Sequence, residues 1–193
     1  MRFSGRYIKG EEDSQVFVVL GNGVREEKVL RYLAPKFNGT KYILSYTPSP
    51  LSIKPEKRTG ISAIENLVRI LMVGGFKVKQ ALFLVDREHV SSLDFMVNEI
   101  QRKYSFNVEK VKILRENVAG IFRLSRGGLV IEKFYVVIAG KTKGMEEELK
   151  SLIQGVHGGR FKLRDALVRS TLEQIAKTLP GLYLALKSIE QAN

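Results

Sequence analysis

Residues 81–89 read Ala81-Leu82-Phe83-Leu84-Val85-Asp86-Arg87-Glu88-His89, a short apolar run that ends in charge. An uninterrupted apolar run of this length is typical of a strand buried on both faces of a sheet. Two carboxylates follow where that strand leaves the sheet. Because ligands of open α/β sheets collect at the carboxyl ends of the strands, this stretch predicts a fold class and also the position of a site.

Similar patterns surround this run. Apolar runs typical of strands occupy residues 15–20 and 41–46, and amphipathic patterns typical of helices occupy residues 24–33, 61–72 and 93–103. Strands that alternate with helices predict a mostly parallel sheet. Because the strands are apolar throughout, we expect helices on both faces of the sheet, in a three-layer α/β fold.

The pattern changes in the second half of the chain. Residues 118–124 and 129–138 flank Ser125-Arg126-Gly127-Gly128, which is typical of a β-hairpin turn, and residues 108–114 alternate like a half-buried strand. An antiparallel hairpin is therefore predicted at one end of the sheet. We expect an acidic helix over residues 145–153 to follow this hairpin.

The last part of the chain is predicted to be helical. Gly155, Gly158 and Gly159 suggest a joint, and residues 161–179 and 182–189 have helical patterns. We therefore divide the chain into an α/β domain over residues 1–155 and a helical segment over residues 156–193. The sequence leaves open whether this segment is an appendage, a dimerisation element of a homo-oligomer or a further layer of the same domain.

Composition excludes several classes of protein. The chain has 193 residues, of which 44% are hydrophobic, enough for a proper core. It has no cysteine, which excludes disulfides, thiolate metal sites and cysteine nucleophiles. It shows neither an apolar run long enough for a membrane span nor a secretory leader, so a cytoplasmic protein without a membrane partner is expected. The absence of Cys and Trp alongside many Lys, Glu and Ile suits a thermostable protein.

The chain is strongly basic. It carries 32 Lys and Arg against 20 Asp and Glu, a net charge of +12. Such a balance indicates an anionic partner, of which nucleic acid, DNA or RNA, is the first candidate. The alternative is that these cations only solvate the surface.

Asp86 and Glu88 are the leading candidates for a metal site. In an extended chain alternate residues point to the same side, so their carboxylates can converge. Mg²⁺ or Mn²⁺ suits a few carboxylates plus water, often together with a phosphate substrate. The alternative is that Asp86 caps the loop and that Glu88 pairs with Arg87 or another surface cation.

Three further carboxylates bear on this site. Glu26 and Glu27 follow the first strand's turn, and parallel strands would bring them to the same edge of the sheet as Asp86. Glu132 interrupts an apolar strand, where a charge is unexpected, and is a third candidate metal ligand. Its alternative is a solvent-facing position paired with a cation on a neighbouring strand.

These motifs resemble those of the Toprim domain, an α/β domain of topoisomerases, primases and some nucleases. In that family a Glu-Gly after the first strand acts in acid–base chemistry, and an Asp-x-Asp-like pair after a later strand binds Mg²⁺. Here Val19-Leu20-Gly21-Asn22-Gly23 corresponds to the first motif and Asp86-Arg87-Glu88 to the second. The resemblance covers residues 14–140, with Leu20 in the position of the glutamate. It implies that Glu26 or Glu27, one helical turn later, takes the catalytic role.

Loops and turns offer the cations that would contact nucleic acid. A basic run lies in the proline-rich segment 47–60, and other cations lie at the hairpin and after the glycine joint. Arg and Lys in such places bind phosphates without reading sequence. The candidates are Lys54, Lys57, Arg58, Arg123, Arg126, Arg160, Lys162 and Arg164.

The expected function is therefore nucleic-acid binding with Mg²⁺-dependent phosphoryl transfer of the nuclease type. The alternative is a catalytically inactive nucleic-acid-binding or assembly module with the same fold, which the leucine at position 20 favours. A third hypothesis is a small nucleotide bound at Gly21-Asn22-Gly23, since backbone N–H groups at the start of a helix attract phosphate.

Overall fold

A computed structural model describes residues 1–4, 8, 10–11, 13–21, 24–37, 43–46, 60–65, 67–68, 77–157 and 162–192. Its strands are β1 (Arg2–Ser4), β2 (Gln15–Leu20), β3 (Ile43–Tyr46), β4 (Gln80–Asp86), β5 (Asn107–Arg115), β6 (Ala119–Arg126) and β7 (Leu129–Ala139). Its helices are α1 (Val24–Leu33), α3 (Leu93–Tyr104), α4 (Met145–His157), α5 (Leu163–Arg169), α6 (Leu172–Thr178) and α7 (Pro180–Gln191), with short 3₁₀ turns η1 (Ala34–Lys36) and η2 (Gly60–Ala63).

The strands form one seven-stranded sheet in the order β1-β3-β2-β4-β7-β6-β5. The first five of these are mutually parallel, and β6 pairs antiparallel with both β7 and β5. Gly127 and Gly128 adopt positive φ between β6 and β7, as a tight hairpin turn requires. The structure thus confirms a mostly parallel sheet with an antiparallel hairpin.

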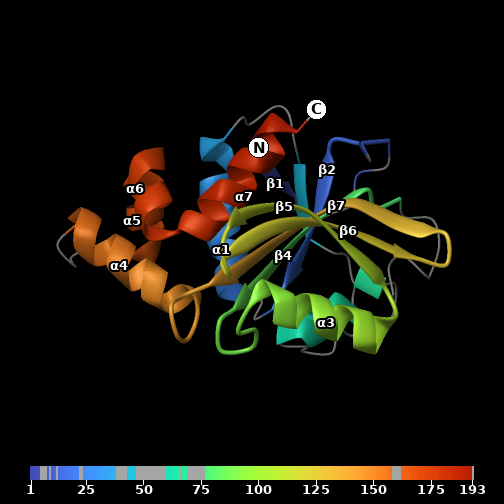
Figure 1. The fold of residues 1–193 in the computed structure, drawn as a ribbon. Helices are drawn as coiled ribbons and strands as arrows, with labels where there is room; N and C mark the ends of the chain where they lie inside the picture. Colours follow the sequence, from blue (N-terminus) through green and yellow to red (C-terminus); the bar gives the residue numbers. More distant parts are fainter. Residues whose placement is uncertain are drawn as a thin grey trace.

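Side chains of the central strands alternate between two cores. Val18, Leu82 and Leu84 face one core, and Phe17 and Phe83 face the other. The first core is covered by α1, α4 and α7, and the second by α3 and η2. Figure 1 shows α3 on one side of the sheet and α1 and α7 on the other. The predicted three-layer arrangement is confirmed.

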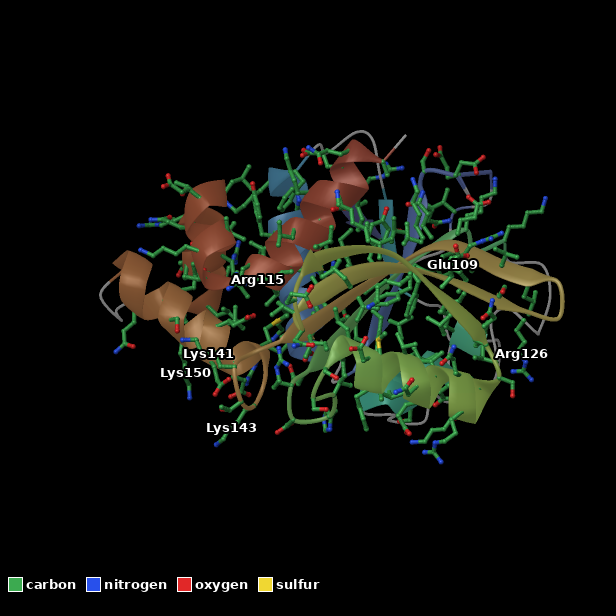
Figure 2. The ribbon with its side chains drawn as sticks, viewed as in Figure 1. Glu109, Arg115, Arg126, Lys141, Lys143 and Lys150 are labelled. Atoms are coloured by element: carbon green, nitrogen blue, oxygen red, sulfur yellow. The ribbon has the colours of Figure 1, made fainter. Side chains whose placement is uncertain are left out.

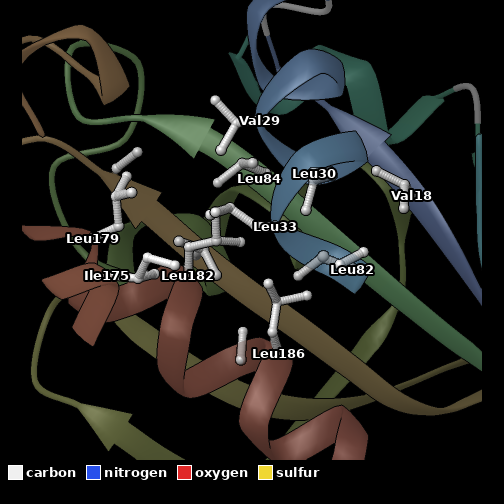
Figure 3. Packing of buried hydrophobic residues seen from close by; sticks show 14 of the residues in the cluster. Val18, Val29, Leu30, Leu33, Leu82, Leu84, Ile175, Leu179, Leu182 and Leu186 are labelled. Carbon is white, nitrogen blue, oxygen red and sulfur yellow. The ribbon is translucent and has the colours of Figure 1, made fainter. Parts of the chain in front are cut away.

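The C-terminal helices are part of the first core. Leu182 and Leu186 of α7 are fully or almost fully buried and belong to the same cluster as Val18 and Leu30. Figure 3 shows these side chains interleaved with those of α1 and β4. Of the roles left open by the sequence, the structure thus shows a further layer on the sheet, and α4 runs continuously across residue 155.

One continuous helix over residues 161–179 was predicted, and this prediction is wrong. The structure has two helices there, α5 and α6, separated at Ser170 and Thr171. Thr171 begins α6 with a capping box: its side chain accepts from the Gln174 N–H, and the Gln174 side chain accepts from the Thr171 N–H. Capping satisfies N–H groups that a continuous helix would bond internally, so the chain can turn at this point.

Two more differences concern the first half of the chain. The sequence pattern missed β1, because a three-residue edge strand is too short to show a period. The predicted helix over residues 61–72 begins within η2, and its positions 66 and 69–72 lie outside the described residues. None of the helices in the described part of the chain is both long and apolar enough to cross a membrane.

Candidate metal-dependent site at the carboxyl edge of the sheet

Asp86 lies at the end of β4, where the loops that follow neighbouring strands lead to opposite faces of the sheet. The loop after β4 leads to α3, on one face of the sheet, whereas the loops after β2 and β7 lead to α1 and α4, on the opposite face. A crevice opens where adjacent parallel strands send their connections to opposite faces, and it is the usual ligand site of such sheets. Since β4 lies between β2 and β7, this rule predicts a crevice on either side of Asp86, and Asp86 lines one cavity in the structure.

The Asp86 carboxylate is held in place by the loop after β7. The side chain is only 7% exposed, and its Oδ1 accepts a hydrogen bond of 2.9 Å from the Met145 N–H at the start of α4. Gly144 packs directly on it: a Cβ added there would lie 2.2 Å from the Asp86 Cγ. The carboxylate therefore depends on a glycine at position 144 for its space.

The expected convergence of Asp86 and Glu88 is not found. The His89 N–H donates to the Asp86 carbonyl at 3.0 Å, so residues 86–89 form a turn and not an extended segment. The turn exposes the Glu88 side chain, which lies 3.5 Å from His89 Nε2, while Asp86 remains buried. The argument that placed both carboxylates on one side of an extended strand is thereby corrected.

Of the two glutamates in α1, Glu26 lies with Asp86. Glu26 is 4% exposed and lines a cavity of about 590 Å³ together with Asp86. Glu27, about 100° further round the helix, bonds Arg31 at 2.6 Å and lies away from this cavity. The sequence contains a signal for this difference, because Glu26 continues the buried stripe formed by Val29, Leu30 and Leu33.

The burial of Glu26 is electrostatically unfavourable. Burial is the main cause that raises the pKa of its carboxyl group, and the nearby charge of Asp86 raises it further. Its Oε2 is buried without a hydrogen-bond partner among the described residues. A carboxylate oxygen left unpaired in such a place is costly, and a proton or a bound cation would relieve the cost.

Glu132 lies at the opposite edge of the sheet. It is seven positions before Ala139, the partner of Asp86 in the β4–β7 register, which corresponds to about 23 Å along the strand. Its side chain is exposed, and its N–H donates to the Lys79 carbonyl at 2.9 Å. The prediction that Glu132 joins Asp86 in one metal site is therefore wrong, and the observed position matches the solvent-facing alternative.

Glu148 is a partly buried carboxyl group near Asp86 that the sequence analysis missed. Its pKa is raised from 4.5 to about 7, mainly because the group is buried. A hydrogen bond from Gly140 lowers the pKa, and the charge of Asp86 raises it. Glu148 lies on the buried stripe of α4 between Met145 and Leu152, the same signal that marks Glu26. Two glutamates thus flank Asp86, one from α1 and one from α4.

The loop between β7 and α4 is shaped by Glu147. Its carboxylate accepts hydrogen bonds from the N–H groups of Lys141, Thr142 and Lys143 at 2.9–3.2 Å and from the Thr142 hydroxyl at 2.6 Å. These donors lower the pKa of Glu147 to about 2. The same loop supplies Gly144, so this interaction fixes the wall against which Asp86 packs.

Arg87 connects three loops at this edge. Its guanidinium donates to the carbonyls of Ser91 at 2.7 Å, Asn117 at 2.6 Å and Gly140 at 3.5 Å. A planar fork of donors suits such a junction, because it can reach several acceptors at once. Arg87 therefore positions the loops and does not pair with Glu88.

The predicted nucleic-acid contacts fall into separate places. Lys162 and Arg164 line a cavity of about 560 Å³ that shares Lys28 and Leu163 with the cavity over Asp86. Arg126 lies at the hairpin, about 30 Å from Ala139 along the length of β7, and Arg123 is 3.6 Å from Glu109 on the adjacent strand. Figure 2 shows Arg126 far from Lys141 and Lys143. The other candidates, Lys54, Lys57, Arg58 and Arg160, lie outside the described residues, as do Asn22 and Gly23 of the glycine turn.

The donor set suits a hard divalent cation bound mainly by water and substrate. Glu26 and Asp86 supply carboxylate oxygens, and one of these oxygens has no partner in the described part of the chain. Within that part, no three His, Cys, Asp or Glu side chains are grouped closely enough to enclose a metal ion. Mg²⁺ usually keeps several waters and uses one or two carboxylates, so a pair is sufficient. Lys28 and the ion pair between Arg25 and Glu146 also line this cavity, so Lys28 alone adds net positive charge beside Glu26 and Asp86.

Comparisons of the chain with family models, with curated proteins and with solved structures gave no significant match.

Proposed function

We propose that this protein binds nucleic acid and cleaves its phosphodiester backbone in a reaction that depends on Mg²⁺ or Mn²⁺, the class of reaction that its resemblance to Toprim domains implies. Because Glu26 lines one cavity with Asp86, we assign Glu26 to the cation and not to the acid–base role that the resemblance implies. The observation that carries the proposal is the Glu26 Oε2 beside Asp86, which has no partner among the described residues and lies in a cavity at the carboxyl edge of the sheet. Two carboxylates buried together are stabilised by a compensating positive charge, and a divalent cation would supply it.

Each residue has a separate part in this proposal. Glu26 and Asp86 would hold the cation, with Asp86 oriented by the Met145 N–H and by the contact with Gly144. The cation would polarise the phosphate and activate a bound water. Arg25 and Lys28, which line the cavity, would attract and orient the phosphodiester. Arg87 and Glu147 would fix the positions of the loops around Asp86.

The second candidate function is a catalytically inactive binding module. It is favoured by the raised pKa of Glu26, because a protonated Glu26 can lie beside an ionised Asp86 without any metal. It is also favoured by Leu20 in the position of the Toprim glutamate. In this case the two residues are structural, and the basic surface alone serves nucleic acid.

The test is cleavage of labelled single- and double-stranded DNA and RNA by the purified protein with Mg²⁺, Mn²⁺ or a chelator. We expect metal-dependent cleavage that is lost in Asp86→Asn and in Glu26→Gln, each of which keeps the side-chain size. Glu27→Gln and Glu132→Gln make the same chemical change away from the cavity and should retain activity.

A calorimetric titration of the protein with Mn²⁺ measures metal binding directly and does not depend on activity. The proposal is supported if the unmodified protein binds Mn²⁺ and Asp86→Asn binds Mn²⁺ at least tenfold more weakly. Cleavage that persists in Asp86→Asn would contradict it, and the absence of both Mn²⁺ binding and cleavage would establish the inactive module.

A further inference from the structure

A second and larger cleft lies near the carboxyl end of β7, and Asp86 does not line it. Its volume is about 1060 Å³, and it lies between the β7–α4 loop, the ends of β5 and α4, and helices α6 and α7. Glu148 lines this cleft, and the charge of Asp86 reaches it. The cleft therefore lies near Asp86 without containing it, whereas Asp86 and Glu26 line the smaller cavity directly.

Basic side chains from three elements line the cleft: Arg115 at the end of β5, Lys141 in the β7–α4 loop and Lys177 in α6. All three are exposed, and none forms an ion pair or a side-chain hydrogen bond with another described residue. Figure 2 shows Arg115 and Lys141 at the same end of the sheet, with Lys143 and Lys150 nearby.

The acidic side chains of the cleft are mostly satisfied by other groups. The Glu147 carboxylate is occupied by the N–H groups of its loop, and Glu148 accepts a hydrogen bond from Gly140. Glu173 lies in the first turn of α6, where a negative charge is stabilised by the helix dipole. Arg115 lies close enough to Glu148 for its charge to lower the pKa of that carboxyl group, although the two form no ion pair. The three cations are thus exposed to an anionic ligand, while most of the carboxylates already have donors.

We propose that this cleft binds the phosphodiester backbone of a nucleic-acid strand, with Arg115, Lys141 and Lys177 contacting successive phosphates. The inference rests on the proposed function, because it supplies a binding surface for the strand that this function would cleave, with Asp86 near enough for its charge to act on Glu148 of the cleft. A polymer suits the cleft better than a small molecule does. Small ligands usually bury most of their surface, whereas these cations are exposed and would bind a strand that stays partly in solvent.

The experiment compares two triple variants of equal charge change. The first is Arg115→Gln, Lys141→Gln, Lys177→Gln, in the cleft. The control is Arg126→Gln, Lys77→Gln, Lys133→Gln, at the opposite edge of the sheet, where Arg126 is itself a candidate from the sequence. Binding of fluorescein-labelled single strands and duplexes, of both DNA and RNA, is measured by anisotropy in EDTA over a range of salt concentrations.

We expect the cleft variant to lose affinity on the order of 100-fold near 0.1 M salt and to reduce the slope of log K against log[salt] by about 2–3. The control should keep most of the slope. Equal losses in both variants, or no loss in the cleft variant, would overturn the proposal. Because these measurements exclude metal, they separate the cleft from the carboxylate pair: intact binding in Asp86→Asn combined with no cleavage by any form removes the catalytic proposal and leaves the cleft.

Discussion

Gly144 shows how a single missing atom makes room for a buried charge. A Cβ at this position would lie 2.2 Å from the Asp86 Cγ and 2.4 Å from its Oδ1. Asp86 is short, buried and bonded to the Met145 N–H, so it cannot move aside freely. We expect Gly144→Ala to lower the free energy of unfolding by about 1–3 kcal/mol, measured by chemical denaturation.

Gly155 is the matched control for this substitution. It lies inside α4, and a Cβ added there would meet no atom within 4 Å. Gly155→Ala should therefore raise the free energy of unfolding by about 0.5–1 kcal/mol, through helix propensity alone. If both glycines respond in the same direction, the contact between Gly144 and Asp86 is not the cause.

The raised pKa of Glu148 predicts how the free energy of unfolding should depend on pH. Burial raises its pKa from 4.5 to about 7 in the folded protein, so the folded state binds more protons than the unfolded state between these values. The contribution of Glu148 to stability is therefore fully present below pH 4.5 and is lost as the pH rises through 7. Between pH 5 and pH 8 in metal-free buffer, the unmodified protein should lose this stability and Glu148→Gln should not. The free energy of unfolding of Glu148→Gln, relative to that of the unmodified protein, should therefore rise by about 1–3 kcal/mol over this range. Parallel pH profiles for the two proteins would refute this.

At the level of elements, the β7–α4 connection depends on Glu147. Hydrogen bonds from Thr142 and from the N–H groups of the loop lower the pKa of Glu147 from 4.5 to about 2. The stability that these bonds provide is present above pH 4.5 and is lost as the pH falls toward 2. Glu147→Gln should lower the melting temperature at pH 6, and the difference from the unmodified protein should shrink by pH 2.5. Glu146→Gln, whose carboxylate bonds Arg25 and not the loop, is the control.

For the whole molecule, the C-terminal helices and the sheet should unfold together. Leu186 of α7 is fully buried in the same cluster as Val18 of β2, so Leu186→Ala should cost about 2–5 kcal/mol of the free energy of unfolding. Val168→Ala, at a position 52% exposed in α5, should cost less than about 0.5 kcal/mol.

Far-UV circular dichroism follows the helices in this experiment, and tyrosine fluorescence follows the packing of the sheet and of the helices, since it includes Tyr183 of α7 as well as the buried Tyr135 of β7. Coincident transitions, both shifted by Leu186→Ala, are expected from one cooperative core. Two resolved transitions, of which Leu186→Ala shifts only the earlier, would show that the C-terminal helices form a separate unit.

Much of the fold was predictable because its signals are local. The apolar runs of β2 and β4, the stripes of α1 and α3 and the glycines of the β6–β7 turn each specify their element within a few residues. The sequence prediction missed the break between α5 and α6 at Thr171, because the amphipathic pattern continues through the capping box that begins the second helix. The site was predicted less well. Asp86 was found from the end of its strand, but Glu88 turns away and Glu132 lies at the other edge.

The sequence by itself determined the α/β class, the hairpin, the net charge of +12 and the position of Asp86 at the carboxyl edge of the sheet. Periodicity and turn chemistry act between neighbours in the chain, so these properties need no knowledge of the fold. Only the tertiary structure decided that Glu26 and Glu148 flank Asp86, and that Arg115, Lys141 and Lys177 line one cleft. Those groupings depend on the strand order and on the face to which each loop leads, which long-range packing determines.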